Sequence, residues 1–147
     1  MRVLVVCEGN TCRSPAAEAA IRAAAARTGV AVDVSSAGTS AERIGAPPTP
    51  AMVDVGRERG IEISGTASQV TAEQLESVDL ILAMDRRTEL FLQTLTSTTP
   101  IELFGSYDAS ATSPEIPDPY GGDGAVYAAT LERIISAADA LVASITD

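Results

Sequence analysis

The sequence predicts an α/β fold: a three-layer sandwich in which a four-stranded parallel sheet carries helices on both faces. Short apolar, β-rich segments alternate with helix-forming segments along the chain, and a glycine-containing loop joins the first strand to the first helix. The 147 residues suit one domain and contain no repeat or linker. We therefore expect a single domain over residues 1–147.

Four segments have the composition of strands, and their expected bounds are 2–6, 30–36, 78–84 and 101–104. The third is a continuous apolar run with one charge, as expected of a strand that is covered on both faces. Functional loops of such sheets gather at the carboxyl ends of the strands. The long loops 40–50 and 105–124 are therefore of interest.

The first helix is predicted directly after the glycine-containing loop. Ser14 suits the N-cap and Pro15 the first helical position, where a missing N–H is harmless. Residues 16–27 are good helix formers, and Gly29 follows them. Together these segments form a strand, loop and helix unit of a size that can hold phosphate.

Capping residues locate the later helices. Thr71 and Gln74 have the spacing of a capping box, and Asp85 can cap the next helix. We expect these helices over about 50–59, from residue 72, from Asp85 to about 95, and near the C-terminus, with the last burying a face made of Val126, Thr130, Ile134, Ala138, Leu141 and Ile145.

Composition excludes several functional classes. The net charge of −10 is the wrong sign for nucleic acid or an anionic membrane. Because there is no His and every basic residue is Arg, Ser-His-Asp, Cys-His and Schiff-base lysine chemistry are excluded. No apolar run approaches the about 20 residues of a membrane span, and no signal peptide is evident. We expect a cytoplasmic protein without a cofactor or metal.

The chemistry is concentrated in the nine residues from Cys7 to Pro15, CEGNTCRSP. A thiolate attacks rather than a thiol, and the backbone N–H groups of 8–14, the helix dipole and Arg13 all favour negative charge at Cys7. The same donors suit a tetrahedral phosphate, which Arg13 can hold with a planar fork. We predict Cys7 as nucleophile and Arg13 as oxyanion clamp. The alternative is a buried structural Cys7 and a surface Arg13.

A proton donor must come from elsewhere in the chain. Asp118 lies in the loop after the last strand, at the sheet edge where Cys7 is expected. Asp85, Asp108 and Asp123 are rivals, and an Asp in a loop is commonly a turn residue or helix cap. The residues alone leave this choice open.

The chain resembles the low-molecular-weight protein tyrosine phosphatases over nearly its whole length. The loop carries the most specific part of the match. The segments that follow in matching order are Ser35–Thr39, Gly60–Ile61, Gln69–Thr71, Ala83–Asp85, Ile101–Leu103, Gly105–Asp108 and Asp118–Tyr120. The resemblance implies a phosphotyrosine phosphatase I-like fold and a phosphorylated protein substrate, with phosphate or another oxyanion bound in the loop.

The resemblance also implies roles for single residues. Cys7 would form a phosphocysteine, with Asp118 first as general acid and then as the base that activates water. Ser14 would donate a hydrogen bond to the thiolate, and Asn10 would hold the loop open in a network with Ser36. The other residues expected to bind substrate are Glu8, Gly9, Thr11, Cys12 and Tyr120.

Cys12 has two interpretations. It can be a small buried residue at the base of the loop. By the resemblance, it can instead form a reversible disulfide with Cys7 that shields the nucleophile from irreversible oxidation.

Several positions depart from the family pattern. Glu42 and Gly121 stand where aromatic residues are usual, so that Tyr120 remains to pack against a phenol ring. Gly65 and Ser68 replace a common His and Arg, so the network behind the loop is expected to lack a member.

The related protein arginine phosphatases resemble this chain at Thr11 and at Gly121–Gly122, and Glu8 adds an acidic wall that suits a cation. Packing alone also accounts for Thr11, and solvation for Glu8. We expect phosphotyrosine as the substrate, with phosphoarginine as the alternative. Two further hypotheses are an arsenate reductase that uses an external thiol and a non-catalytic anion-binding module.

Overall fold

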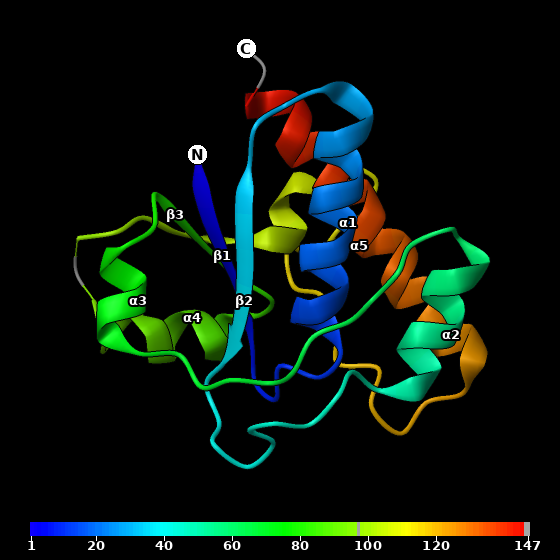
Figure 1. Ribbon diagram of the computed structural model, residues 1–147, viewed down its shortest axis with the longest axis horizontal. Helices are drawn as coiled ribbons and strands as arrows, with labels where there is room; N and C mark the ends of the chain where they lie inside the picture. Colours follow the sequence, from blue (N-terminus) through cyan, green and yellow to red (C-terminus); the bar gives the residue numbers. More distant parts are fainter. Residues whose placement is uncertain (97, 146–147) are drawn as a thin grey trace.

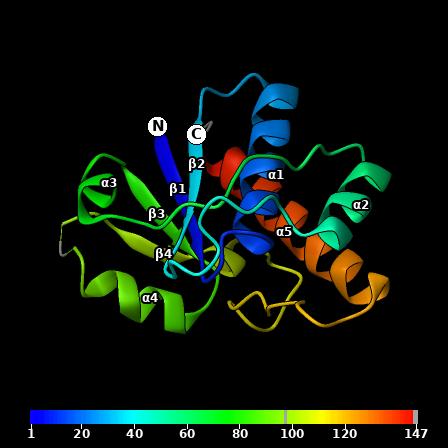
Figure 2. The same cartoon turned by 60° about the horizontal axis from the view of Figure 1, so that its bottom comes forward.

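A four-stranded parallel sheet lies between two layers of helices in the computed structural model, which describes residues 1–96 and 98–145 (Figures 1 and 2). The strands are β1 (Arg2–Cys7), β2 (Asp33–Gly38), β3 (Leu80–Ala83) and β4 (Ile101–Leu103). Their order is β2-β1-β3-β4, and every pair is parallel. The predicted fold class is confirmed.

Two helices cover each face of the sheet. The helices are α1 (Arg13–Thr28), α2 (Pro50–Glu58), α3 (Ala72–Glu76), α4 (Arg86–Gln93) and α5 (Gly124–Ile145), with a short 3-10 helix at Phe104–Tyr107. Helices α1 and α5 pack together on one face, and α2 lies against α5. Helices α3 and α4 lie on the opposite side (Figure 1).

The central strand β1 is buried on both sides. Val3 and Val5 belong to the core beneath α1 and α5, whereas Leu4 and Val6 belong to the core beneath α3 and α4. All four side chains are fully buried. This explains why residues 3–6 are all apolar, because alternate side chains of the strand enter different cores. The strand ends at Cys7, in the middle of the sheet edge.

Capping predictions were accurate where the contacts are local. The Thr71 hydroxyl accepts from the Gln74 amide at the start of α3, and the Asp85 carboxylate accepts from the Thr88 amide at the start of α4. Gly29 ends α1 with a left-handed φ of 75°.

The start of α1 differs from the prediction. The helix begins at Arg13 with Cys12 in the N-cap position, so the expected N-cap role of Ser14 and the first helical place of Pro15 were wrong. The Ser14 hydroxyl is instead within hydrogen-bond distance of the Cys7 sulfur. Local capping rules take no account of such a partner.

The bounds of two predicted strands also differ from the observed ones. Strand β2 occupies 33–38 rather than 30–36, because its pairing with β1 begins at Asp33. Strand β3 is shorter than its apolar run. Val126 is 44% exposed and not part of the buried face, since it lies in the first turn of α5. The rest of that predicted face is buried or half-buried: Thr130, Ile134, Ala138, Leu141 and Ile145.

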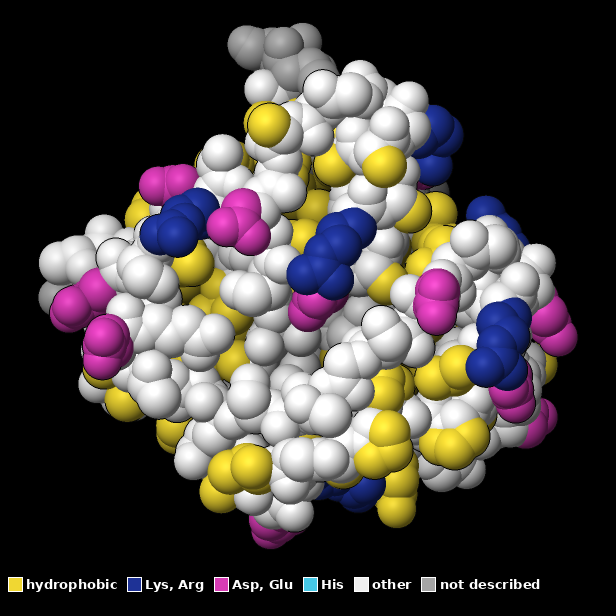
Figure 3. Space-filling model, viewed as in Figure 1, with side chains coloured by type: hydrophobic (Ala, Val, Ile, Leu, Met, Phe, Trp, Pro, Cys, Tyr) yellow, Lys and Arg dark blue, Asp and Glu magenta, His cyan; other side chains and the backbone are white. Residues whose placement is uncertain are grey.

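The surface agrees with the acidic composition. On the face shown in Figure 3, Arg side chains stand singly and close to acidic ones rather than as a continuous basic patch. Among the described residues, no helix is both long and apolar enough to cross a membrane.

A buried carboxylate anchors the loop that follows β4. Asp108 is 4% exposed and accepts hydrogen bonds from Ser110, from Ser136 of α5, and from Arg133 of α5. Arg133 also donates to the carbonyl of Glu115 in the same loop. Burial opposes ionisation of Asp108, but these hydrogen bonds outweigh it and hold its pKa below the ordinary value.

We expect Asp108→Asn to lower the free energy of unfolding by about 2–4 kcal/mol, because an amide nitrogen would face donors in a buried site. The folded pKa lies below the unfolded one, so the stabilisation exists above the unfolded value of about 3.9 and disappears as the pH falls through the folded value. Urea unfolding at pH 7 and at lower pH measures this. Asp139→Asn, at an exposed position of α5, is the control. An equal loss of unfolding free energy in the two variants would contradict the role of Asp108 as the anchor of this loop.

Candidate functional site

The loop between β1 and α1 brings a cysteine and an arginine to the same sheet edge. Cys7 and Arg13 are each 3% exposed. Asn10 turns the loop with a positive φ of 54°, a conformation that Asn tolerates better than most residues. Gly38 lets the end of β2 approach, since a Cβ there would lie 2.7 Å from the Glu8 carbonyl oxygen. The loop is therefore tightly packed against the sheet.

A hydrogen-bond network contacts the Cys7 sulfur from within the loop. The sulfur accepts from the Asn10 amide at 3.2 Å and lies 2.9 Å from the Ser14 hydroxyl oxygen. Asn10 Nδ2 donates to Ser14 at 2.8 Å and to Ser36 at 3.1 Å, and its Oδ1 accepts from the Ser68 amide. Because Asn10 donates to the Ser14 oxygen, the hydroxyl proton is available to the sulfur. Two hydrogen-bond donors therefore converge on the sulfur.

Arg13 is oriented by Asp85, the N-cap of α4, which follows the neighbouring strand β3. Its Nη1 donates to Asp85 at 2.9 Å and to the Ile116 carbonyl at 2.9 Å. Burial opposes the charge of Arg13, but Asp85 and Cys7 outweigh it and raise its pKa. Burial likewise opposes ionisation of Asp85, yet Arg13 and Thr88 lower its pKa. Nε and Nη2 of Arg13 donate to no other residue of the described chain.

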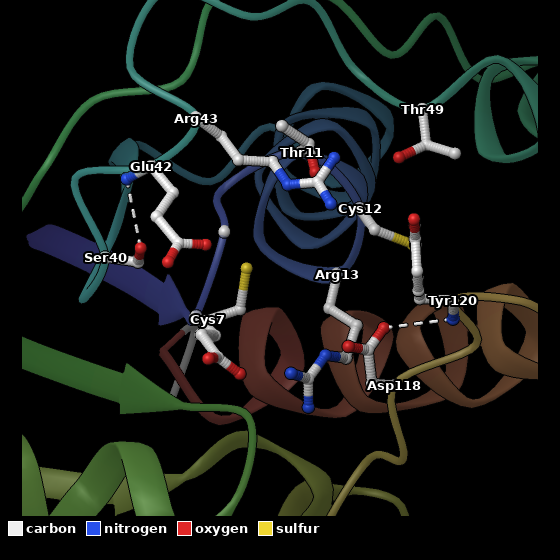
Figure 4. A pocket seen from close by; sticks show the side chains of 12 residues that line it. Cys7, Thr11, Cys12, Arg13, Ser40, Glu42, Arg43, Thr49, Asp118 and Tyr120 are labelled. Carbon is white, nitrogen blue, oxygen red and sulfur yellow. Dashed lines mark hydrogen bonds between the residues drawn. The ribbon is translucent and has the colours of Figure 1, made fainter.

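The loop opens into a cavity of about 210 Å³. It is lined by Cys7, Glu8, Gly9, Thr11, Cys12, Arg13, Ser40, Glu42, Arg43, Thr49, Asp118 and Tyr120. Figure 4 shows the side chains of Cys7, Arg13 and Asp118 around one hollow, with Arg43 and Tyr120 at its rim. A thiolate, a guanidinium and a protonated carboxyl group at these positions can respectively attack, hold and protonate a phosphate ester.

Most of the predicted site residues line this cavity. Asn10, Ser14 and Ser36 do not, because their side chains form the network behind the loop. Sequence reasoning missed Arg43 and Thr49 of the 40–50 loop, although the length of that loop was a signal. Sequence reasoning also gave no such role to three further residues. Ser40 and Glu42 line the cavity, and Asp85 orients Arg13.

The structure separates the four candidate acids. Asp118 lines the cavity and accepts from the Tyr120 amide at 3.1 Å. Asp85 is engaged with the loop guanidinium, Asp108 with α5, and Asp123 with the first turn of α5. Of the four, only Asp118 has its carboxylate at the cavity.

The second cysteine differs in its surroundings from the first. Burial above all, then the charges of Asp118 and Cys7, raise the pKa of Cys12 to about 12, although Arg13 acts against this. Cys12 is therefore a neutral thiol at physiological pH. Both cysteines are free thiols here, and the disulfide between them stays a prediction.

Across residues 1–96 and 98–145, no group of three or more Cys, Asp or Glu side chains is arranged to hold a metal ion.

The amides of Gly9, Thr11 and Cys12 donate to no other residue of this described part, so they are available to an oxyanion beside the sulfur.

Comparisons with known proteins identify the family of the chain. The family model described as low molecular weight phosphotyrosine protein phosphatase matches residues 2–147. A human protein of that name is 39% identical, covering 82% of this chain and 80% of the relative. A protein-arginine-phosphatase from Bacillus subtilis is 33% identical, covering 91% and 89%. A protein tyrosine phosphatase structure from Entamoeba histolytica superposes with a TM-score of 0.95 at 26% identity, covering 99% and 97%.

Proposed function

The chain belongs to the low molecular weight phosphotyrosine protein phosphatase family of cysteine-dependent phosphatases, and we propose that it hydrolyses phosphotyrosine in proteins through a phosphocysteine at Cys7. The observation that carries this proposal is that Cys7, Arg13 and Asp118 line the same cavity. Tyr120 supplies an aromatic wall for the phenol ring.

The first step is attack of the Cys7 thiolate on phosphorus. The S–P bond forms, the P–O bond to the phenol breaks, and Asp118 gives its proton to the leaving oxygen. The amides of Gly9, Thr11 and Cys12 and the unengaged nitrogens of Arg13 supply donors for the phosphoryl oxygens. The thiolate is stabilised by the Ser14 hydroxyl, which lies 2.9 Å away.

The second step returns the enzyme to its starting state. The Asp118 carboxylate takes a proton from water, and the water oxygen attacks the phosphorus of the phosphocysteine. The S–P bond breaks, phosphate leaves, and Cys7 is a thiolate again. Asp118 then holds the proton that the next turnover needs.

Phosphoarginine is the alternative substrate, and two observations favour it. A relative is named a protein-arginine-phosphatase. Thr11 and Glu8 both line the cavity, and they supply a hydroxyl and a carboxylate that suit a guanidinium.

We expect Thr11→Ile to raise the phosphotyrosine-to-phosphoarginine ratio of kcat/KM by about tenfold, because it replaces a hydroxyl by an apolar group. Matched phosphopeptides measure the ratio. Thr49→Val removes another hydroxyl from the cavity lining and is the control. A wild-type preference for phosphoarginine would overturn the phosphotyrosine assignment, and an unchanged ratio would reduce Thr11 to a packing residue.

We also place this activity in the cytoplasm. A thiolate nucleophile must stay reduced, and cytosolic thiol systems keep free cysteines in that state.

A further inference from the structure

Arg43 spans the mouth of the cavity. It comes from the 40–50 loop, and its Cδ lies 3.6 Å from the point that a Cβ on Gly9 would occupy. Its guanidinium carbon lies 5.3 Å from the centre of the Tyr120 ring. Figure 4 shows the side chain extending above Cys7 toward Tyr120. Arg43 therefore bridges the phosphate-binding loop and the loop that carries Asp118.

The contact with Tyr120 is weak enough to break. Arg43 and Tyr120 are both exposed, and a cation–π contact at an exposed site contributes little. Arg43 forms no ion pair with any described residue, even though Glu42 is its neighbour and also lines the cavity. Its guanidinium is thus held over the ring without a carboxylate partner.

Tyr120 is the one aromatic side chain among the described residues that line the cavity. A substrate ring whose phosphate reaches Cys7 has this ring to stack on. Figure 4 shows the Arg43 guanidinium on the side of Tyr120 that faces Cys7. The cation therefore occupies the face that the substrate needs.

We infer that Arg43 is a gate and a specificity residue: in the free protein its guanidinium lies against the side of the Tyr120 ring that faces Cys7, and a substrate must displace it. The inference rests on the proposed hydrolysis of phosphoprotein by this cavity. A planar group, such as a phenol ring or a guanidinium, can replace Arg43 on Tyr120 and compensate for the lost contact. An aliphatic group such as that of phosphoserine cannot, so the gate selects against it.

The test compares Arg43→Gln with Arg57→Gln. Both variants remove one exposed positive charge, but Arg57 is on α2 and does not line the cavity. The readouts are the KM of a phosphotyrosine peptide and the inhibition constant of inorganic phosphate. Phosphate occupies only the loop and does not need the face of Tyr120.

A gate predicts opposite trends for the two readouts. Arg43→Gln should lower the KM of the peptide by about two- to five-fold, while phosphate inhibition stays equal or weakens. If Arg43 only attracts anions, the peptide KM and the phosphate constant will rise together, which overturns the gate. If neither changes relative to Arg57→Gln, the gate is also overturned. In a Tyr120→Leu background, Arg43→Gln should no longer lower KM.

A binding measurement separates this inference from the proposed function. Phenyl phosphate is titrated calorimetrically into Cys7→Ser and into Cys7→Ser with Arg43→Gln. Tighter binding by the double variant supports the gate, and equal affinity overturns it. Hydrolysis is not needed for this readout, so a failure to turn over phosphotyrosine would refute the proposed function and leave the gate to be decided by affinity.

Discussion

Replacing Cys7 by Ser is expected to lower kcat for p-nitrophenyl phosphate by at least about 10⁴-fold. A serine hydroxyl is a much weaker acid than a thiol and therefore a poorer nucleophile, even with the donors of Asn10 and Ser14 in place. Steady-state kinetics measures the loss. An acid quench with labelled substrate tests for a phosphorylated chain, which the wild type should accumulate transiently.

Cys12→Ser is the control for this prediction. Cys12 lines the same cavity, but burial keeps it a neutral thiol, so its loss should lower kcat by no more than about tenfold. Calorimetric titration should show that Cys7→Ser still binds phosphate, because the loop donors remain. Substantial turnover by Cys7→Ser, or a larger loss in Cys12→Ser, would refute Cys7 as the nucleophile.

Asp118→Asn is expected to lower kcat for a phosphotyrosine peptide by about 10²- to 10⁴-fold. The amide cannot give a proton to the leaving oxygen and cannot activate water as a base. Asp118 is the one of the four candidate aspartates that lines the cavity, and the other three are engaged elsewhere. Single-turnover and steady-state rates on the same peptide measure each step.

The leaving group provides the internal control. p-Nitrophenolate leaves readily without a proton, so Asp118→Asn should slow its release much less than that of tyrosine. Asp123→Asn, a change at the first turn of α5, should leave both substrates nearly unaffected. Equal losses on both substrates in Asp118→Asn would indicate a role other than proton donation in the first step.

Features that depend on near neighbours in the chain could be predicted. The caps at Thr71 and Asp85 and the glycine after α1 form contacts within a few residues. That Cys7 and Arg13 line the same cavity could also be predicted, since they belong to one continuous loop. Such contacts are encoded by spacing alone.

Features that depend on partners distant in the chain could not be predicted from the sequence. Ser14 has the pattern of an N-cap, yet its hydroxyl is engaged with Cys7 and Asn10. The start of β2 was set by its register with β1. The role of Asp85 became visible because β3 lies beside β1 and places that carboxylate against Arg13.

By itself, the sequence determined the class of fold and the loop in which Cys7 and Arg13 lie close together, because each is encoded in contiguous residues or in a repeating apolar pattern. Only the tertiary structure decided which of four aspartates lines the cavity with Cys7, which residue orients the Arg13 guanidinium, and that the Arg43 guanidinium lies 5.3 Å from the centre of the Tyr120 ring. These are contacts between loops far apart in the chain. Their geometry follows from how the strands assemble in the sheet, and no local spacing records it.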